Sequence, residues 1–296
     1  MQQIKFLIKI IFFEYFLKIF KKKPSYKTYS LREFCNFKKN RNRKKVVVHM
    51  IWISGKLTQI EIMCINSFIK HGFEVNIWTN NNNLPNAPHK INVIKIPKIF
   101  SIKNNLSYSQ GSNYALNSDI LRIQILYKYG GLYADTDMIC NIDEKKFSKF
   151  FTEPFLCSEK HHISTNGLRI NNNLMFFPKS NNNLLSLINN FYMNYFVEKN
   201  EKKKILWGIF GGSFFTVFAE NFPNYLPLIM KPEFSNPVPY WKSPEAFLYS
   251  NIRFSDQTAF IHLYNERWKV SKINKNRKYK SGSIIDLMLK KYSNYK

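Results

Sequence analysis

The stretch that decides the fold is Gly130-Gly131-Leu132-Tyr133-Ala134-Asp135-Thr136-Asp137-Met138-Ile139-Cys140, an apolar run that begins with a glycine pair and holds two aspartates one residue apart. Residues i and i+2 of a strand project from the same face, so Asp135 and Asp137 should lie side by side unless the strand ends before them. Adjacent carboxylates repel each other, and a hard divalent cation with oxygen ligands would neutralise them. The stretch therefore predicts a metal-diphosphate site at a strand end. The alternative is a polar turn, where Asp is common.

The residues before this stretch predict a helix that ends at the glycine pair. Ser118 is suited to be its N-cap, and Gly130 or Gly131 can adopt the left-handed conformation that ends many helices. On a helical wheel, one narrow polar stripe should face water; it consists of Asn117, Gln124 and Lys128.

Two charged residues of the predicted helix, Asp119 and Arg122, lie on the opposite, apolar side. Burying a lone charge is costly, and the i, i+3 spacing allows the two to pair. One interpretation is a structural ion pair. The other is that both reach a polar ligand beside the aspartates, and it is favoured because the helix runs directly into the Asp-x-Asp stretch.

The order Ser-Asp-x-x-Arg followed by Tyr-x-x-Gly-Gly-x-Tyr-x-Asp-x-Asp resembles the sugar-nucleotide-binding region of glycosyltransferase family 32. That family includes yeast mannosyltransferases and bacterial capsule and lipopolysaccharide sugar transferases, and the large clostridial glucosylating toxins share its core. The resemblance implies an α/β fold of the GT-A type, a Rossmann-like nucleotide-sugar-binding fold with a mixed central sheet flanked by helices.

The resemblance also implies roles for the residues of the motif. Asp135 and Asp137 would be catalytic and would hold Mn²⁺ or Mg²⁺ against the donor diphosphate, with Asp135 also touching the donor. Further donor contacts would come from Asp119, Arg122, Gly131 and Tyr133.

Segments on the amino-terminal side fit an alternating α/β pattern. Residues 46–55 read as a buried strand and a turn, 57–71 as a helix, and 73–79 and 91–96 as further strands, which favours a sheet with ligands at the strand carboxyl ends. The first strand resembles the family's opening strand. Its Trp52 would stack on the nucleotide base, with a core tryptophan as the alternative.

Three segments of the second half also resemble the family. Residues 171–178 resemble the strand that follows the catalytic region, with Asn172 chosen among three asparagines as a catalytic residue near the donor sugar. Residues 211–216 would belong to the acceptor side. Residues 261–268 resemble the closing segment that folds over the diphosphate, in which His262 and Trp268 would contact the donor and Arg267 stands where a small residue is common.

Composition limits the classes of function. The formal net charge is +26, which favours anionic partners such as phosphates, acidic lipids or nucleic acid. No zinc finger, RNA-recognition motif or basic helix is recognisable, so specific nucleic-acid binding is a weak alternative. The four cysteines show no metal-ligand spacing and are interpreted as ordinary thiols in a reducing compartment.

The domain interpretation divides the chain at Pro24. Residues 1–24 form a basic, hydrophobic segment that either lies on an anionic membrane surface or packs on its own domain, and residues 25–296 form the catalytic domain. Charged residues interrupt the apolar run of the first segment, so it is a poor membrane span, and it lacks a signal-peptide cleavage site. The expected location is cytoplasmic, peripheral on the inner face of the membrane.

The sequence thus predicts a metal-dependent, retaining hexosyltransferase. Its donor would be a nucleotide-diphosphate sugar, with UDP-sugars favoured over GDP-sugars. Its acceptor would be a glycan or a lipid-linked glycan, in bacterial capsule or lipopolysaccharide/lipooligosaccharide synthesis. A toxin-like transferase that glycosylates a protein is the alternative with the same catalytic core.

Overall fold

The computed structural model describes residues 26–35, 45–53, 55–81, 83–97, 107–108, 113–161, 167–198, 204–205 and 208–293. The amino-terminal segment 1–24, with its predicted membrane contact, lies outside the described residues. Within the described residues, none of the helices combines the length and the apolar character needed to cross a bilayer.

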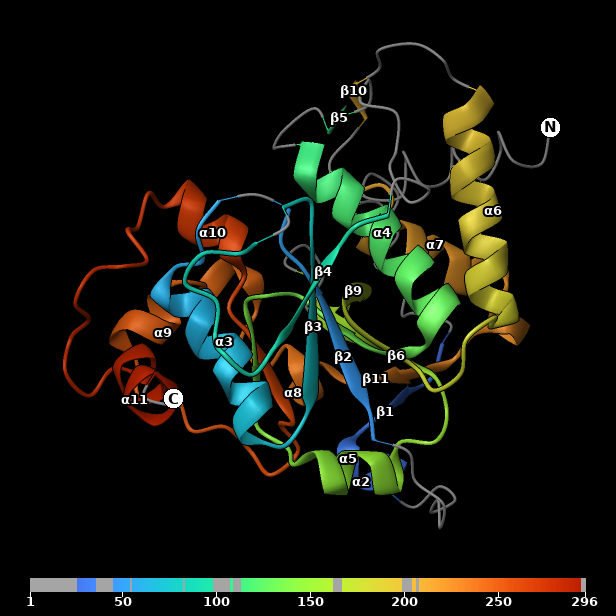
Figure 1. Cartoon of the computed structure of the whole chain (residues 1–296). Helices are drawn as coiled ribbons and strands as arrows, with labels where there is room; N and C mark the ends of the chain where they lie inside the picture. The colour runs from blue at the N-terminus through green and yellow to red at the C-terminus, as the bar shows by residue number, and fades with distance from the viewer. Residues whose placement is uncertain are drawn as a thin grey trace.

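A central sheet organises the fold, with eight strands in the order β1-β11-β8-β9-β6-β2-β3-β4 (Figure 1). Its strands are β1 (Thr28–Tyr29), β2 (Val47–Ile51), β3 (Glu74–Thr79), β4 (Asn92–Lys95), β6 (Gly131–Ala134), β8 (Phe155–Lys160), β9 (Leu168–Phe177) and β11 (Leu228–Met230). Two small ladders accompany it: β7 (Met138–Cys140) with β12 (Phe260–His262), and β5 (Ser107–Tyr108) with β10 (Lys204–Ile205).

The sheet is mixed because one strand runs against its neighbours. β9 pairs antiparallel with both β6 and β8, whereas the other pairs of the sheet are parallel. The register places Ala134 opposite Leu174, so the carboxyl end of β6 meets the asparagine run of β9. The prediction of an α/β fold with a mixed central sheet is confirmed.

Helices cover both faces of the sheet. They are α2 (Leu31–Phe34), α3 (Gln59–Lys70), α4 (Asn113–Tyr129), α5 (Glu144–Phe150), α6 (Asn183–Glu198), α7 (Gly212–Asn221), α8 (Pro232–Ser235), α9 (Glu245–Tyr249), α10 (Asn265–Val270) and α11 (Ile284–Tyr292). Two 3₁₀ turns are η2 (Pro223–Tyr225) and η3 (Tyr240–Lys242).

Side chains alternate between the two faces along each strand, and the sheet therefore separates two hydrophobic cores. In β6, Leu132 and Ala134 belong to the core shared with α2, α3 and α5, whereas Tyr133 belongs to the core shared with α4, α6 and α7. Successive side chains of a strand point to opposite faces, so a continuous apolar strand can bury both of them. This arrangement explains why the strands read as unbroken hydrophobic runs.

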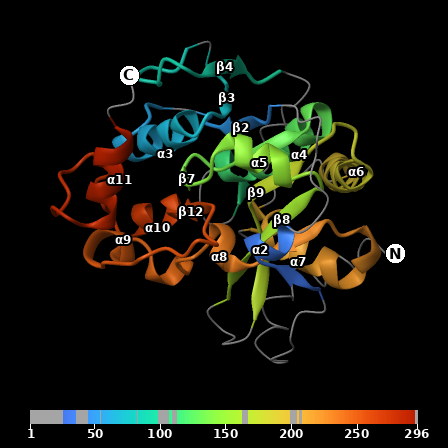
Figure 2. The same ribbon diagram turned by 90° about the horizontal axis from the view of Figure 1, so that it is seen from below.

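A third core forms on the far side of α3. It joins α3 to α9, α10 and α11, which gather on one side of the molecule in both ribbon views (Figures 1 and 2). Trp268 and Tyr292 are fully buried in this layer. Residues 238–292 therefore return to pack against α3, the first helix after β2.

Sequence signals predicted the start of α3 correctly and the start of α4 wrongly. Thr58 and Glu61 form a reciprocal capping box at the start of α3, close to the predicted boundary. The predicted N-cap at Ser118 is wrong, because α4 already begins at Asn113. Ser118 instead lies inside the helix, where its hydroxyl accepts a hydrogen bond from Arg122 Nη2 at 3.2 Å.

The predicted water-facing stripe of α4 is also wrong at one position. Gln124 is buried, and its Nε2 lies 3.6 Å from Met193 Sδ. The reason is tertiary, since α6 packs along this side of α4 and covers it. Lys128 is exposed, as expected.

The glycine pair is required by the backbone and by close packing. Gly130 and Gly131 have φ values of 67° and 94°, a region that side chains rarely tolerate. A Cβ on Gly131 would lie 2.7 Å from the carbonyl oxygen of Val47 on β2. The pair ends α4 with an N–H of Gly130 donating to Leu126 O at 2.8 Å, and it lets β6 enter the sheet at once.

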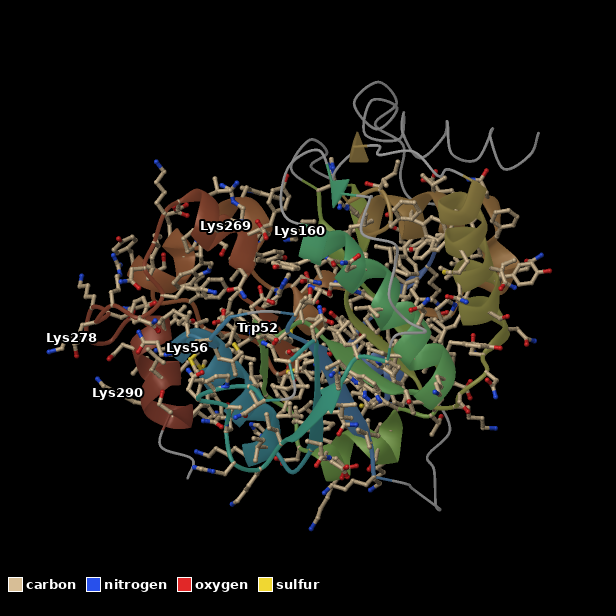
Figure 3. All side chains as sticks on the ribbon, turned by 45° about the horizontal axis from the view of Figure 1, so that its top comes forward. Trp52, Lys56, Lys160, Lys269, Lys278 and Lys290 are labelled. Atoms are coloured by element: carbon tan, nitrogen blue, oxygen red, sulfur yellow. The ribbon has the colours of Figure 1, made fainter. Side chains whose placement is uncertain are left out.

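The exposed lysines belong to separate elements. Lys269 lies on α10, Lys290 on α11 and Lys160 on β8, while Lys56 and Lys278 lie in connecting segments (Figure 3). Positive charge is thus distributed over several elements of the described chain and is not confined to one recognition helix.

Buried His49 should make folding stability depend on pH. His49 accepts a hydrogen bond from Trp78 Nε1 at 3.1 Å, and desolvation lowers its pKa to about 4. Its ordinary pKa is about 6.5, so as the pH falls below that value the unfolded chain binds a proton that the folded chain excludes. Stability should fall by about 2 kcal/mol from this group between pH 7 and 5.

Denaturant unfolding at pH 7 and pH 5 measures this effect. His49→Gln should lose less stability between the two values than the unmodified chain, and the same substitution at exposed His89 provides the control. An equal loss in the His49→Gln protein would contradict the assignment.

Candidate active site

The Asp-x-Asp motif lies in a tight turn. β6 ends at Ala134 and β7 begins at Met138, and the turn is closed by Met138 N donating to Asp135 O at 3.0 Å. The strand has therefore ended before the aspartates. The turn, and not the strand repeat, brings the two carboxylates to the same side.

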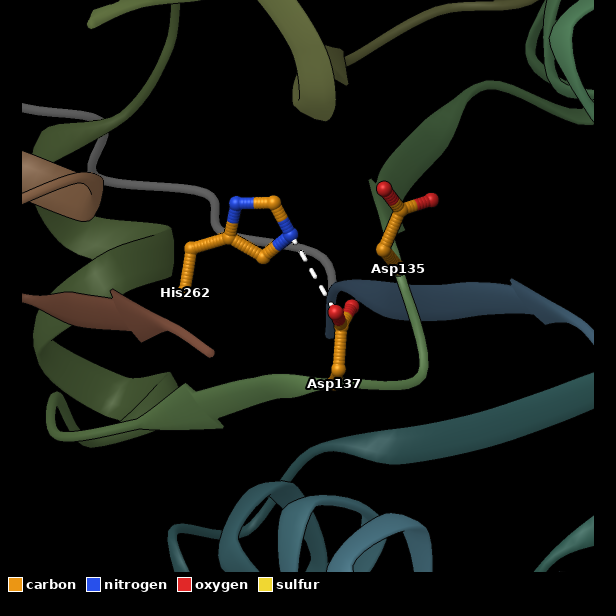
Figure 4. A group of neighbouring side chains, drawn as sticks. All are labelled: Asp135, Asp137 and His262. Atoms are coloured by element: carbon orange, nitrogen blue, oxygen red, sulfur yellow. Dashed lines mark ion pairs between the residues drawn. The ribbon is translucent and has the colours of Figure 1, made fainter. Parts of the chain in front are cut away.

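A histidine from a distant part of the chain completes the cluster. β12 pairs antiparallel with β7 and sets His262 opposite Met138. One ligand atom from each of Asp135, Asp137 and His262 lies within 4.8 Å of the others, and His262 Nε2 is 3.4 Å from Asp137 Oδ2 (Figure 4). Three titratable side chains from two elements thus converge on one point.

The two carboxylates have opposite electrostatic environments. Burial raises the pKa of Asp135 and the Asp137 carboxylate adds to this, while Arg122 partly offsets it. Burial also disfavours the Asp137 carboxylate, but His262 and the N–H of Asn265 outweigh it and hold the pKa of Asp137 below its usual range. Burial disfavours the imidazolium of His262, yet the aspartates prevail and raise its pKa.

The segment after β12 holds Asp137 in place. Asn265 N donates to Asp137 Oδ2 at 2.6 Å, and Leu263 N donates to Asp137 O at 3.0 Å. Between them, Tyr264 adopts the left-handed conformation with φ 59°. The start of α10 is thereby turned towards the carboxylate, which satisfies an otherwise unpaired helix N–H.

Asp135 is held from the α4 side. Tyr133 OH donates to Asp135 Oδ1 at 2.7 Å, and Arg122 Nη1 lies 3.4 Å from the same oxygen. The Arg122 guanidinium also lies over the Tyr133 ring, 4.6 Å from its centroid. The backbone N–H of Asp135 donates to Asn173 O at 2.9 Å, which ties the turn to β9.

Asp119 and Arg122 of α4 form one buried group with Asn172, beside the aspartates. Arg122 Nη2 lies 3.3 Å from Asp119 Oδ1, and Asn172 Nδ2 donates to that oxygen at 2.8 Å. Arg122 Nη1 also donates to Asn172 O at 2.8 Å. Asp119 and Arg122 therefore pair with each other and lie beside the Asp-x-Asp turn, and their predicted contact with a ligand stays a prediction.

The two tryptophans occupy different settings. Trp52 follows β2 and is half-buried against the core that the sheet shares with α2, α3 and α5. Its Nε1 donates to Gly55 O at 3.0 Å. Its predicted contact with a base stays a prediction. Trp268 is fully buried, and its Nε1 donates to Leu263 O at 2.8 Å. It is a core residue that fixes the backbone next to His262, which gives no support to the predicted donor contact.

Residues that the sequence did not single out support His262. Asn173 Nδ2 lies 2.7 Å from His262 Nδ1 and donates to Asn236 Oδ1 at 2.7 Å. Tyr264 OH also donates to Asn236 Oδ1, at 3.3 Å. The triple asparagine run was a visible signal for Asn173, whereas Asn236 lies in a segment with no motif.

A second buried network was missed entirely. Glu61 on α3 is fully buried and forms an ion pair with Lys275, and Asn265 Nδ2 donates to Glu61 Oε1 at 3.0 Å. Lys275 Nζ also donates to Asn265 Oδ1 at 3.1 Å. The network thus holds the side chain of the residue whose backbone N–H binds Asp137. Glu61 is far in the sequence from Asn265 and Lys275, so no local sequence pattern predicts this network.

The donor set fits a divalent cation. Carboxylates are the side-chain ligands that Mn²⁺ and Mg²⁺ prefer, and an imidazole suits a transition-metal ion such as Mn²⁺ better than Mg²⁺. The three side chains converge here among buried groups. Asp135, Asp137 and His262 are the residues that would hold the ion. Hydrogen bonds to Asp137 and His262 from neighbouring groups orient these ligands, as outer-shell partners do in metal sites.

Two family models match the chain. Residues 14–148 match the glycosyltransferase sugar-binding region containing the DXD motif, and residues 108–205 match the TcdA/TcdB catalytic glycosyltransferase domain. Both matched ranges contain α4 and the Asp-x-Asp turn. No curated protein matches the chain by sequence.

Solved structures with a related arrangement are also glycosyltransferases. PaToxG glycosyltransferase is 19% identical with a TM-score of 0.43, covering 62% of this chain and 70% of that chain. GlyE of Streptococcus pneumoniae TIGR4, in its apo form, is 12% identical with a TM-score of 0.44, covering 84% and 63%. An active-site mutant of LgtC is 11% identical with a TM-score of 0.40, covering 73% and 86%. These TM-scores carry no argument about the chain, whose similarity to glycosyltransferases rests on the two family models.

Removing a carboxylate should weaken metal binding strongly. Asp137→Asn and Asp135→Asn should each weaken Mn²⁺ binding by more than about a hundredfold, beyond the usual cost of an outer-shell change. Titration calorimetry without nucleotide measures this directly. Asp143→Asn is the matched control, because that carboxylate is exposed and pairs with His71. Unchanged Mn²⁺ affinity in the Asp137→Asn protein would refute the site.

Metal affinity should fall as the pH falls. The pKa values of Asp135 and His262 are both raised, so each holds its proton to a higher pH than usual and a cation must displace it. Mn²⁺ dissociation constants measured from pH 8 down to pH 5.5 should increase steadily. A pH-independent constant would argue against these two groups as ligands.

The Glu61–Lys275 pair should stabilise the protein and the site together. Lys275→Met leaves a buried carboxylate without its cation, which should cost about 3 kcal/mol of folding stability. Mn²⁺ binding should also weaken, because Asn265 loses its fixed position. The double variant Lys275→Met/Glu61→Gln should recover most of the stability.

Exposed Lys278, three residues further along the same segment, provides the control as Lys278→Met. Chemical unfolding and calorimetry report the two effects separately. A Lys275→Met protein as stable as the control would show that the pair is not a structural link.

Proposed function

Because the chain is a glycosyltransferase, we propose that it transfers a hexose, with retention of configuration, from a nucleotide-diphosphate sugar to a glycan or lipid-linked acceptor. The observation that carries this proposal is the convergence of Asp135, Asp137 and His262 beside the buried Asp119–Arg122–Asn172 group. Residues 25–296 form the catalytic unit in this proposal, and the donor is a UDP-sugar in preference to a GDP-sugar.

The charge that develops on the leaving diphosphate needs stabilisation. Asp135, Asp137 and His262 would hold a Mn²⁺ or Mg²⁺ ion, which would supply a Lewis acid for the phosphate oxygens. Arg122 adds a fixed positive charge, held by its contacts with Asp119, Asp135 and the Tyr133 ring. Such preorganised charge costs no reorganisation during the reaction.

Asp119 and Asn172 are placed to orient the sugar. Their side chains are buried and hydrogen-bonded to each other at 2.8 Å, next to Gly211, the N-cap of α7. A carboxylate oxygen and an amide can bind sugar hydroxyl groups as acceptor and donor. In this proposal the acceptor hydroxyl attacks from the leaving-group side, its proton passes to the departing phosphate oxygen, and no protein nucleophile is used.

The cellular role in this proposal is the assembly of a bacterial surface glycan. Synthesis of bacterial capsule or lipooligosaccharide places such an enzyme in the cytoplasm, peripheral to the inner face of the membrane, where lipid-linked acceptors are available. The basic composition favours an anionic surface. Transfer to a protein is the second candidate, and the match of residues 108–205 to the TcdA/TcdB catalytic domain favours it.

Donor hydrolysis tests the reaction class. The purified chain should release nucleotide from one UDP- or GDP-sugar in the presence of Mn²⁺ or Mg²⁺, and chelation or Asp137→Asn should abolish the release. Asn172→Ala should lower the rate by about a hundredfold with little change in metal affinity, because it removes a polar contact to the reacting sugar and no metal ligand.

The Asp143→Asn protein should behave like the unmodified chain. Nuclear magnetic resonance of the released or transferred sugar reports whether the anomeric configuration is retained, and intact-mass analysis of candidate proteins tests the second candidate. Failure to turn over every donor, together with no metal-dependent nucleotide binding, would refute the proposed function.

A further inference from the structure

We propose that Tyr240 and Trp241 form an acceptor subsite that binds the pyranose ring of a carbohydrate chain, at a sugar unit beyond the one that reacts. The inference rests on the proposed glycosyl transfer and extends it from the donor to the acceptor. A run of aromatic rings that joins the Asp-Asp-His cluster to the surface supports it.

The run begins at a residue of the cluster. The ring of Tyr264 lies 4.0 Å from that of His262, and the ring of Tyr240 lies 6.4 Å from that of Tyr264. Trp241 follows, with its ring 5.3 Å from Tyr240 and nearly perpendicular to it at 88°. The two outer steps lie within the range of about 4.5–7 Å that aromatic pairs prefer, and the rings of His262 and Tyr264 are in closer contact.

Exposure increases along the run. Tyr264 is 8% exposed, Tyr240 is half-buried, and Trp241 is 37% exposed. An indole at the surface next to a polar site is suited to a ligand that has both an apolar and a polar face. A pyranose has these two faces, because its C–H bonds can stack on a ring while its hydroxyl groups reach exposed neighbours such as Lys242 and Glu245.

The aromatic corner is fixed relative to the metal ligands. Ser243 is fully buried, and its Oγ donates to Leu263 O at 2.7 Å, directly after η3. The same Leu263 donates its N–H to Asp137 O and accepts from Trp268 Nε1. A subsite held in this way loses little entropy when it binds a ligand, which favours a binding role.

The location separates this surface from the proposed donor contacts. Asp119 and Arg122 reach the Asp-x-Asp turn from α4 and contact Asp135 and Asn172. The aromatic run reaches the cluster through His262, which comes from β12 and lies beside Asp137. A sugar stacked on Trp241 would therefore approach the cluster from the residues around His262 and would not occupy the Asp119–Asn172 group.

Saturation-transfer magnetic resonance with five disaccharides tests the subsite. The full chain, loaded with Mg²⁺ and UDP, is mixed in turn with maltose, cellobiose, lactose, mannobiose and chitobiose, and its aromatic protons are irradiated. At least one disaccharide should receive saturation on its ring C–H protons. Trp241→Ala should weaken its binding by about tenfold, the size of one stacking contact.

Two further variants make the result specific. Trp241→Phe keeps an aromatic face and should bind within about threefold of the unmodified chain. Tyr249→Ala removes another exposed aromatic ring, on α9 and outside the run, and should change nothing.

Donor hydrolysis, measured in parallel, separates the two levels of the proposal. If the unmodified chain hydrolyses no nucleotide-sugar donor, the proposed function is contradicted. Intact hydrolysis with no bound disaccharide, or with unchanged affinity in the Trp241→Ala protein, overturns the subsite alone. A Trp241→Ala protein that has lost donor hydrolysis also overturns it, because the residue would then serve the donor site or the fold.

Discussion

The structure around the site depends on keeping two buried carboxylates, Asp135 and Asp137, close together. Mutual repulsion and desolvation both oppose this arrangement, so each carboxylate has its own source of compensation. Arg122 and Tyr133 stabilise Asp135 from the α4 side. His262 and the first N–H of α10 stabilise Asp137 from the opposite side. A divalent cation would complete the balance, which is why this pair of groups is suited to bind one.

This constraint links parts of the chain that are distant in sequence. The third hydrophobic core binds α9, α10 and α11 against α3, and it thereby delivers His262 and Asn265 to the Asp-x-Asp turn. The buried Glu61–Lys275 pair reinforces the same junction. Packing in the carboxyl-terminal layer and the electrostatics of the site are therefore coupled, and neither can be altered without effect on the other.

The arrangement also separates donor and acceptor functions in the proposed reaction. The rigid helix α4 and strand β9 carry the groups proposed to bind the donor, and both are anchored in the central sheet. The two residues proposed to bind the acceptor, Tyr240 and Trp241, lie on the short element η3, which is joined to the segment after β12 by the hydrogen bond from Ser243 Oγ to Leu263 O. Variation in η3 would change the acceptor without replacing a residue that contacts the Asp-x-Asp turn.

Local sequence determined the features that depend on near neighbours. The order of Asp119, Arg122, the glycine pair and the Asp-x-Asp motif predicted a helix running into the site, because glycine φ values and i, i+3 spacing are properties of short segments. Tertiary structure alone decided that Gln124 is buried, that Trp268 is a core residue, and that Asn173 and Asn236 support His262. These outcomes depend on which segments pack together, and packing joins residues up to some two hundred positions apart that no local pattern relates.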